Sequence, residues 1–146
     1  MFKRCAFVPD VLFGIGFDSS FSTITKRLAP KWKTFVCEQS GASGMIEELV
    51  TSARRLVVVA LTPADTDYVM ALADQYPHQI DGVVLHVEAD QADKVGDWRR
   101  QTKFSGLCKF RADDAEYMAR SLGTMLANID AFSSRVVTPG RIIQLR

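Results

Sequence analysis

The sequence predicts one α/β domain: an open sheet of about five mainly parallel strands, in the order 2-1-3-4-5, with helices on both faces. Short runs rich in β-branched residues alternate with stretches of helical periodicity along most of the chain. Two of these runs, LVVVAL (56–61) and GVVLHVE (82–88), are almost free of polar alternation, which is typical of strands covered on both faces. Strands that alternate with helices pair in parallel through right-handed crossovers.

The first half of the chain predicts two strands and two helices. Apolar residues recur at helical spacing from Phe21 to Leu28, and Pro30 stops that pattern. The elements expected here are a strand at 5–8 (CAFV), a helix at 21–28, a strand at 33–38 (KTFVCE) and a short helix at 45–50 (MIEELV). The run VLFGIGF (11–17) fits a strand, a helix start or an excursion. If it is itself the first strand, the strand order shifts and Asp10 no longer follows the first strand.

The second half predicts three strands and three helices. Thr62 is suited to cap a helix that begins at Pro63 and ends before Pro77. The other elements expected are strands at 56–61, 82–88 and 106–110, and helices at 92–104 and 118–132. Residues 1–132 therefore form the predicted domain, and 133–146 are expected to be a C-terminal extension or linker.

Composition narrows the class of protein. The chain has 146 residues, of which 47% are hydrophobic and 24% charged, and its formal net charge is +1. No run approaches the roughly 20 apolar residues of a spanning helix, so we expect a cytoplasmic protein. The three cysteines, Cys5, Cys37 and Cys108, lack metal-ligand spacing and are expected to be buried thiols.

The stretch GIGFDSS (14–20) raises the question of a phosphate site. It lacks the third glycine of the dinucleotide fingerprint and the GK[ST] of a Walker loop. One interpretation is a turn whose serines cap the following helix. The alternative is a flavodoxin-like loop that binds the phosphate of FMN or of a nucleotide. The residues of that alternative site are Ser19, Ser20, Ser22 and Thr23.

Three stretches resemble the receiver domain of response regulators: KRCAFVPD (3–10), TFVCEQSGASGMIEELV (34–50) and GLCKFRADDAEYMARSLGTML (106–126). The resemblance implies that Asp10 is the surviving acidic residue of the family's magnesium site. It also implies that Lys109 stands where the family has its invariant lysine.

The chain departs from receivers where their chemistry occurs. The phosphoryl-accepting aspartate is replaced by Val59 or Ala60, and the hydroxyl residue that ends the fourth strand by His86. In-line phosphoryl transfer needs both the nucleophile and the metal ligands. The resemblance therefore implies a pseudo-receiver that is not phosphorylated at the usual position. We expect it to hold no cofactor and no metal, and a non-enzymatic role is favoured over an enzymatic one.

Two groups of residues are candidates for function. The first is a degenerate receiver site at the carboxyl edge of the sheet, made of Asp10, Thr62, His86 and Lys109. In its more ordinary interpretation His86 is structural and Lys109 pairs with Asp10. The second is an interface on the fourth helix, fifth strand and last helix, made of Trp98, Arg99, Arg100, Arg111, Tyr117 and Arg120.

These residues favour a regulatory domain that acts through a protein partner or by forming a homodimer. The alternative is a flavodoxin-like protein that binds a small molecule, FMN or a nucleotide. A membrane role is not expected. Nucleic acid is disfavoured because acidic residues such as Asp97 lie between the basic ones.

Overall fold

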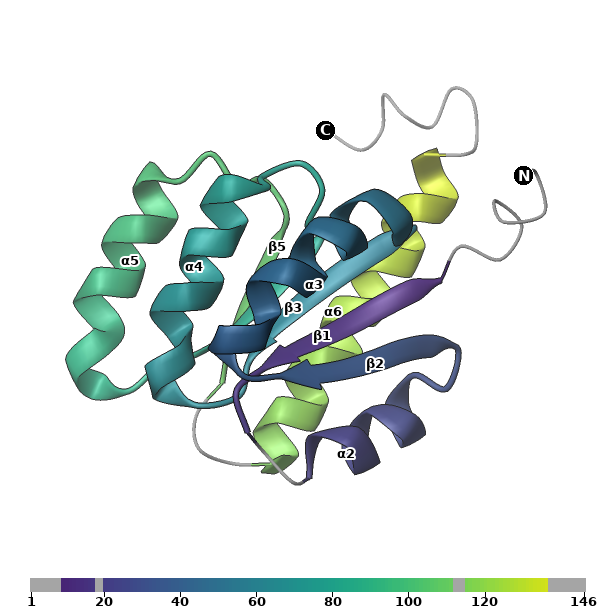
Figure 1. The fold of residues 1–146 in the computed structure, drawn as a ribbon, viewed down its shortest axis with the longest axis horizontal. Helices are drawn as coiled ribbons and strands as arrows, with labels where there is room; N and C mark the ends of the chain where they lie inside the picture. The colour runs from purple at the N-terminus through teal and green to yellow at the C-terminus, as the bar shows by residue number, and fades with distance from the viewer. Residues whose placement is uncertain (1–8, 18–19, 112–114, 137–146) are drawn as a thin grey trace.

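The computed structural model describes residues 9–17, 20–111 and 115–136 (Figure 1). Its strands are β1 (Asp10–Ile15), β2 (Trp32–Cys37), β3 (Arg55–Ala60), β4 (Gly82–His86) and β5 (Leu107–Arg111). Its α-helices are α2 (Phe21–Leu28), α3 (Gln39–Ser52), α4 (Thr66–Gln75), α5 (Ala92–Gln101) and α6 (Ala115–Val136). Short 3-10 turns, Pro63–Asp65 and Ala89–Gln91, precede α4 and α5.

The five strands form one parallel sheet in the order β2-β1-β3-β4-β5, which confirms the predicted fold class. In the register of the sheet, Ile15 of β1 lies between Cys37 of β2 and Ala60 of β3. The carboxyl ends of these three strands therefore meet at one edge of the sheet. The loops that follow them are consequently neighbours.

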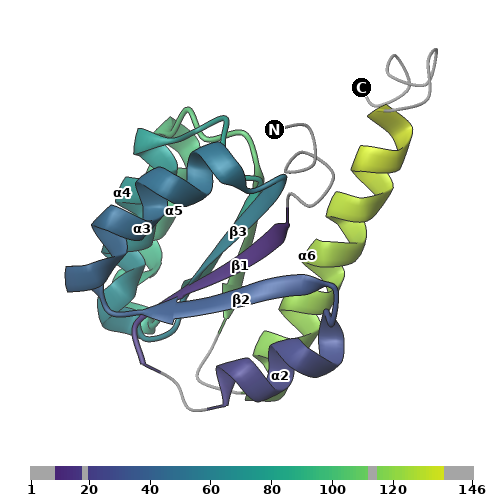
Figure 2. The ribbon, with the colours of Figure 1, turned by 45° about the vertical axis from the view of Figure 1, so that its right-hand side comes forward.

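Helices cover both faces of the sheet, as Figures 1 and 2 show: α3, α4 and α5 on one face, α2 and α6 on the other. Side chains of β1 alternate between the two layers. Phe13 belongs to the core beneath α3, α4 and α5, whereas Leu12 packs with residues of α2 and α6. The continuous burial of β3 follows from its central place between these layers, as its unbroken apolar run predicts.

The first strand differs from the element predicted at its position. Residues 5–8 lie outside the described part of the chain, and the first described strand is DVLFGI, Asp10–Ile15. All six of its residues are buried. A glycine is accommodated inside this strand because the ring of Phe21 packs against Gly14, where a side chain would otherwise stand.

Two helices extend beyond their predicted bounds. The helix predicted at 45–50 begins at Gln39, because the SGASG segment joins it rather than forming a turn. Helix α6 continues past residue 132, where the sequence predicted the domain to end, as far as Val136. Residues 137–146 of the expected extension lie outside the described part.

The contact between Gly14 and α2 gives a test of the packing. A Cβ atom at Gly14 would stand 2.9 Å from Cε2 of Phe21 and 3.1 Å from Cδ1 of Leu61. We expect Gly14→Ala to lower the free energy of unfolding by about 1–3 kcal/mol through overpacking, measured by urea denaturation.

The matched control is Gly44→Ala, where the new Cβ meets nothing within 4 Å. Because Gly44 is exposed within α3, that change is expected to be neutral or stabilising. Equal stability of the two variants would contradict the packing described.

Candidate functional site at the carboxyl edge of the sheet

A cavity of about 410 Å³ opens where the loops after β1, β2 and β3 meet. The chain leaves β1 towards β2 on one side and returns to β3 on the other, so this is the switch point at which open α/β sheets bind ligands. We call this cavity the carboxyl-edge pocket. It is lined by Gly16, Phe17, Glu38, Gln39, Ser40, Thr62 and Asp65.

Gly16 lines the pocket and determines how the loop after β1 runs. Its φ of 122° lies in the left-handed region, which favours glycine. Its backbone N–H donates to the carbonyl oxygen of Cys37 at 2.9 Å. A Cβ atom at this position would overlap the carboxylate of Asp65. Only a glycine therefore allows the loop after β1 to approach the loop after β3 this closely.

Asp65 holds the pocket together. Its side chain is buried, and it accepts hydrogen bonds from Nε2 of Gln39 at 2.9 Å and from the hydroxyl of Thr62 at 2.5 Å. The Gln39 amide also donates to the carbonyl oxygen of Ala64 at 3.3 Å. These bonds tie the first turn of α3 to the loop after β3. Thr62 thus uses its hydroxyl within the pocket, not to cap the turn that follows it.

The predicted cluster of Asp10, Thr62, His86 and Lys109 is not formed. Thr62 lines the pocket, but Asp10 begins β1 and lies at the opposite, amino edge of the sheet. Lys109 lies inside β5, opposite Val84 of β4. The prediction failed because it took Asp10 to follow a strand at 5–8, whereas Asp10 is the first residue of the strand at 10–15.

His86 ends β4 and is buried, with 2% of its surface exposed. Its backbone N–H and carbonyl both bond to the hydroxyl of Thr66, at 3.1 and 2.6 Å. Its Nδ1 lies 3.4 Å from the carbonyl oxygen of Leu61, and its Nε2 finds no partner in the part of the chain described. The residue does not line the carboxyl-edge pocket. These contacts give it a structural place between β4, α4 and the loop after β3.

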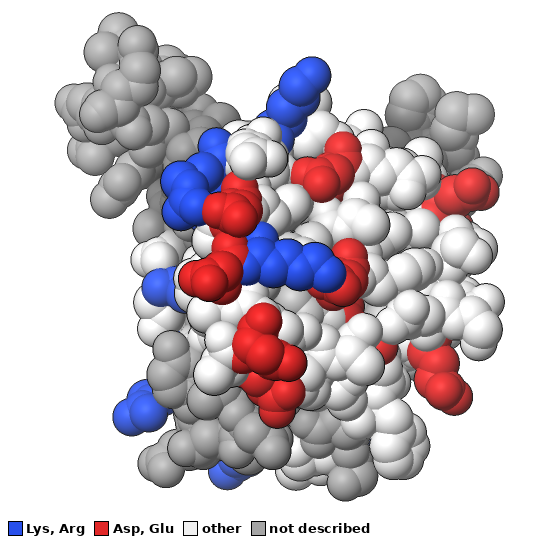
Figure 3. Space-filling view, turned by 90° about the vertical axis from the view of Figure 1, so that its left-hand side faces the viewer, with Lys and Arg blue, Asp and Glu red and all other residues white. Residues whose placement is uncertain are grey.

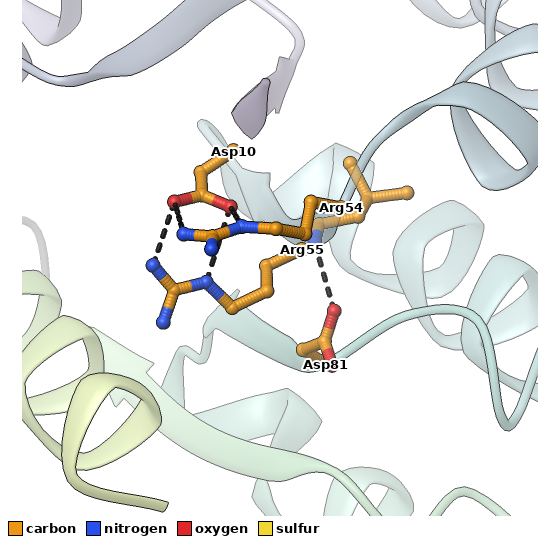
Figure 4. A network of polar contacts seen from close by, with 5 residues as sticks. Asp10, Arg54, Arg55 and Asp81 are labelled. Carbon is orange, nitrogen blue, oxygen red and sulfur yellow. Dashed lines mark hydrogen bonds and ion pairs between the residues drawn. The ribbon is translucent and has the colours of Figure 1, made fainter. Parts of the chain in front are cut away.

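Asp10 is bound by two arginines, not by Lys109 (Figure 4). Its carboxylate accepts two hydrogen bonds from Arg54, at 3.0 and 2.8 Å, and two from Arg55, at 3.1 and 2.6 Å. The Arg55 guanidinium also stands over the ring of Trp32, 5.3 Å from its centroid. The ion-pair partner predicted from the sequence was therefore wrong.

The surroundings of the amino-edge acids shift their pKa values in opposite directions. Burial alone would raise the pKa of Asp10, but the hydrogen bonds and charges of Arg54 and Arg55 outweigh it and lower the pKa to about 2. Burial raises the pKa of Asp81, although its carboxylate accepts a hydrogen bond from the backbone N–H of Leu56 at 2.8 Å. Asp10 binds the first residue of β3 and Asp81 binds the backbone of the next one, so the contacts at this edge are structural.

The described residues of the predicted phosphate loop do not line the pocket. Ser19 is outside the described residues, and Ser20 precedes α2 without a side-chain capping bond. Ser22 and Thr23 are exposed in the first turn of α2, which lies on the opposite face of the sheet from α3. None of the three described residues lines the carboxyl-edge pocket.

Trp98, one of the predicted interface residues, is used inside the domain. Its indole N–H donates to both carboxylate oxygens of Asp74 at 3.0 Å, and its ring stacks on Phe104 with centroids 6.3 Å apart. Trp98 therefore joins α5 to α4. Beside it, Thr102 also donates to Asp74.

Part of the basic charge on α5 is paired with acidic side chains. Arg100 pairs with Asp97, and Lys94 pairs with Asp67 at 2.7 Å. Figure 3, which views the side carrying α5, shows acidic and basic side chains interspersed. Arg99 and Arg120 are exposed, whereas the side chains of Arg111 and Tyr117 lie outside the described set.

Comparisons with known proteins return no relative. No protein-family model matches the chain, and no curated protein or solved structure matches it either. Within the described residues, no helix is long and apolar enough to cross a membrane. The same residues contain no group of three or more His, Cys, Asp or Glu that could hold a metal ion. The site is therefore interpreted from its own geometry.

The paired state of Asp10 predicts a pH dependence. The pKa of Asp10 is 3.8 in an unperturbed chain and about 2 when folded, so its contribution is complete above pH 3.8 and is lost as the pH falls through 2. We expect Asp10→Asn to lower the free energy of unfolding by at least about 2 kcal/mol at pH 7, with the deficit shrinking towards pH 2. Urea denaturation at several pH values measures it.

Asp90→Asn, which alters an exposed carboxylate, is the control for this experiment. Asp81 contributes the opposite slope, because a raised pKa favours proton uptake by the folded state. That contribution is present in wild type and variant alike, so it largely cancels in their difference. A deficit of the Asp10 variant that stays constant down to pH 2 would contradict the assignment.

Proposed function

We propose that this chain is a regulatory domain that binds a small molecule in the carboxyl-edge pocket and does not accept a phosphoryl group. The observation that carries the proposal is the cavity of about 410 Å³ at the switch point of the sheet. Its size is in the range typical of small-molecule sites, about 300–1,000 Å³. Its polar side chains come from the segments after β2 and β3, which the hydrogen bond between Gln39 and Asp65 joins.

The lack of phosphoryl chemistry is part of the proposal. Val59 and Ala60, at the end of β3, are buried apolar residues that cannot form an acyl phosphate. Asp10, which the resemblance makes a metal ligand, is bound to Arg54 and Arg55. The relationship to receivers itself remains a proposal, supported by the strand order 2-1-3-4-5.

Nuclear magnetic resonance of the full chain tests the proposal directly. Amide shifts of Gly16, Gln39, Ser40 and Thr62 are followed during titration with FMN, adenine nucleotides and small phenyl compounds of each charge. We expect at least one of these to shift the pocket amides. Ser40→Trp, which places a large ring at the pocket, is expected to abolish the shifts. Ser52→Trp, exposed at the other end of α3, is the matched control.

Two results would overturn the proposed pocket. One is a panel in which no compound moves any pocket amide. The other is binding that persists unchanged in the Ser40→Trp protein. FMN or nucleotide shifts confined to the start of α2 would instead support the serine loop of the alternative interpretation.

A second candidate function is contact with a protein partner, including a second copy of this chain. The observation that favours it is Phe110, which is 41% exposed on the edge strand β5 between α5 and α6. Exposed apolar side chains on an edge strand are potential association sites.

Light scattering over a range of concentrations tests self-association. We expect a mass that rises with concentration and a return to the monomer mass in Phe110→Ser. Leu28→Ser, also 41% exposed but on α2, is the matched control and should leave the mass unchanged. A monomer mass at every concentration would exclude self-association through β5.

We also propose a cytoplasmic location. Cys37 and Cys108 are free thiols, which suits a reducing compartment. Burial raises the pKa of Cys108 to about 11, so this thiol is protonated and unreactive at neutral pH.

A further inference from the structure

Two buried aspartates in this protein are compensated in different ways. Asp10 is 9% exposed and has two guanidinium groups against its carboxylate. Asp65 is 6% exposed, yet both of its hydrogen-bond donors are neutral, the amide of Gln39 and the hydroxyl of Thr62. No ion pair to Asp65 is formed within the described residues. Buried charges are normally paired, so the absence of a counter-charge to Asp65 within the described part of the chain is unusual.

The carboxylate of Asp65 also retains capacity to accept hydrogen bonds. Each of its oxygens receives one described side-chain hydrogen bond, from Gln39 on Oδ1 and from Thr62 on Oδ2. A carboxylate offers roughly four acceptor sites, so about two are left for another donor. Asp65 lines the carboxyl-edge pocket, which has room for that donor.

The other described lining residues also carry negative charge or none. Glu38 adds a second carboxylate, and none of the described lining residues is Lys, Arg or His. Among these residues an anionic group would therefore meet two like charges and no compensating cation. Phe17, 78% exposed, adds an aromatic ring to the same lining. Carboxylates next to an aromatic face are the groups that recognise ammonium and guanidinium ligands.

We propose that the carboxyl-edge pocket binds a small organic cation, whose ammonium or amidinium group takes the place of the missing counter-charge of Asp65. Glu38 adds attraction at the rim, and Phe17 contacts the apolar part of the ligand. A metal ion fits less well, because the described residues gather no group of three metal-ligating side chains. This inference rests on the proposed function and narrows it to one class of ligand.

Three probes of nearly equal size and different charge provide the test: phenethylamine, 2-phenylethanol and phenylacetate. Each is titrated into the full chain, with the amides of Gly16, Gln39 and Thr62 as reporters. We expect phenethylamine to bind about tenfold more tightly than 2-phenylethanol, which is the effect of one partly screened charge pair. Phenylacetate is expected to bind most weakly. Added salt should reduce the difference between the amine and the alcohol.

Two variants connect this preference to the carboxylates. Asp65→Asn is nearly isosteric and keeps both contacts, since its oxygen accepts from Gln39 and its amide donates to Thr62. Glu38→Gln changes an exposed side chain and does not endanger the fold. We expect each variant to reduce the preference for the amine severalfold. Glu47→Gln, exposed on α3 outside the pocket, should leave it unchanged.

The outcomes separate this inference from the function on which it rests. If 2-phenylethanol, phenylacetate or a nucleotide shifts the pocket amides as strongly as the amine does, the pocket binds ligands but not as a cation site. If no probe shifts them, both proposals fail. An amine preference that survives in both the Asp65→Asn and Glu38→Gln proteins would also overturn the cation assignment.

Discussion

The pairing of Asp10 with Arg54 and Arg55 is the interaction on which the placement of β1 depends. Asp10 lies opposite Arg55 in the register of the sheet, and the backbone N–H of Arg54 donates to the carbonyl oxygen of Pro9 at 2.8 Å. A slip of one residue would break these bonds and exchange the faces of Phe13 and its neighbours. At the other end of the same register, the N–H of Leu61 donates to the carbonyl oxygen of Ile15 at 3.0 Å. The loops that form the pocket are positioned by this alignment.

The two edges of the sheet consequently have different electrostatic characters. At the amino edge, the charge of Asp10 is matched by arginines from the chain itself, and its pKa is lowered. At the carboxyl edge, Asp65 is surrounded by neutral donors and stands beside a cavity. Ligands of open α/β sheets bind at the carboxyl edge, where loops vary without disturbing strand pairing. The carboxylate of Asp10 is thus paired within the fold, whereas the carboxylate of Asp65 can still accept hydrogen bonds from a ligand.

Much of the fold could be predicted because it depends on local patterns. The apolar runs of β3 and β4 are long, β-branched and bounded by polar residues, and they are buried strands as predicted. The run at 11–17 was ambiguous because it directly follows an acid and contains two glycines, and both residue types are rare in a central strand. Asp10 is tolerated there by arginines 44 and 45 residues further along the chain. No local sequence pattern predicts a contact between residues so far apart in the chain. The hydrogen bond between Trp98 and Asp74, which are 24 residues apart, was unpredictable for the same reason.

The site was harder to predict than the fold, and the reason lies in the contacts of Asp65. The sequence singled out Thr62 at the end of β3, but not Asp65 three residues later or Gln39, which lies 26 residues before Asp65. The only sequence signal was an acid soon after a buried strand. What makes Asp65 part of a site is the close approach of Gly16, in the loop after β1, to its carboxylate, and the sequence does not show that contact. A receiver gathers its acidic residues to hold a metal ion. In this pocket Glu38 and Asp65 come from the loops after β2 and β3, and the described lining residues include no third acid and no histidine. Two carboxylates without a third ligand attract positive charge but do not enclose a bare ion, and this geometry favours an organic cation with donors of its own.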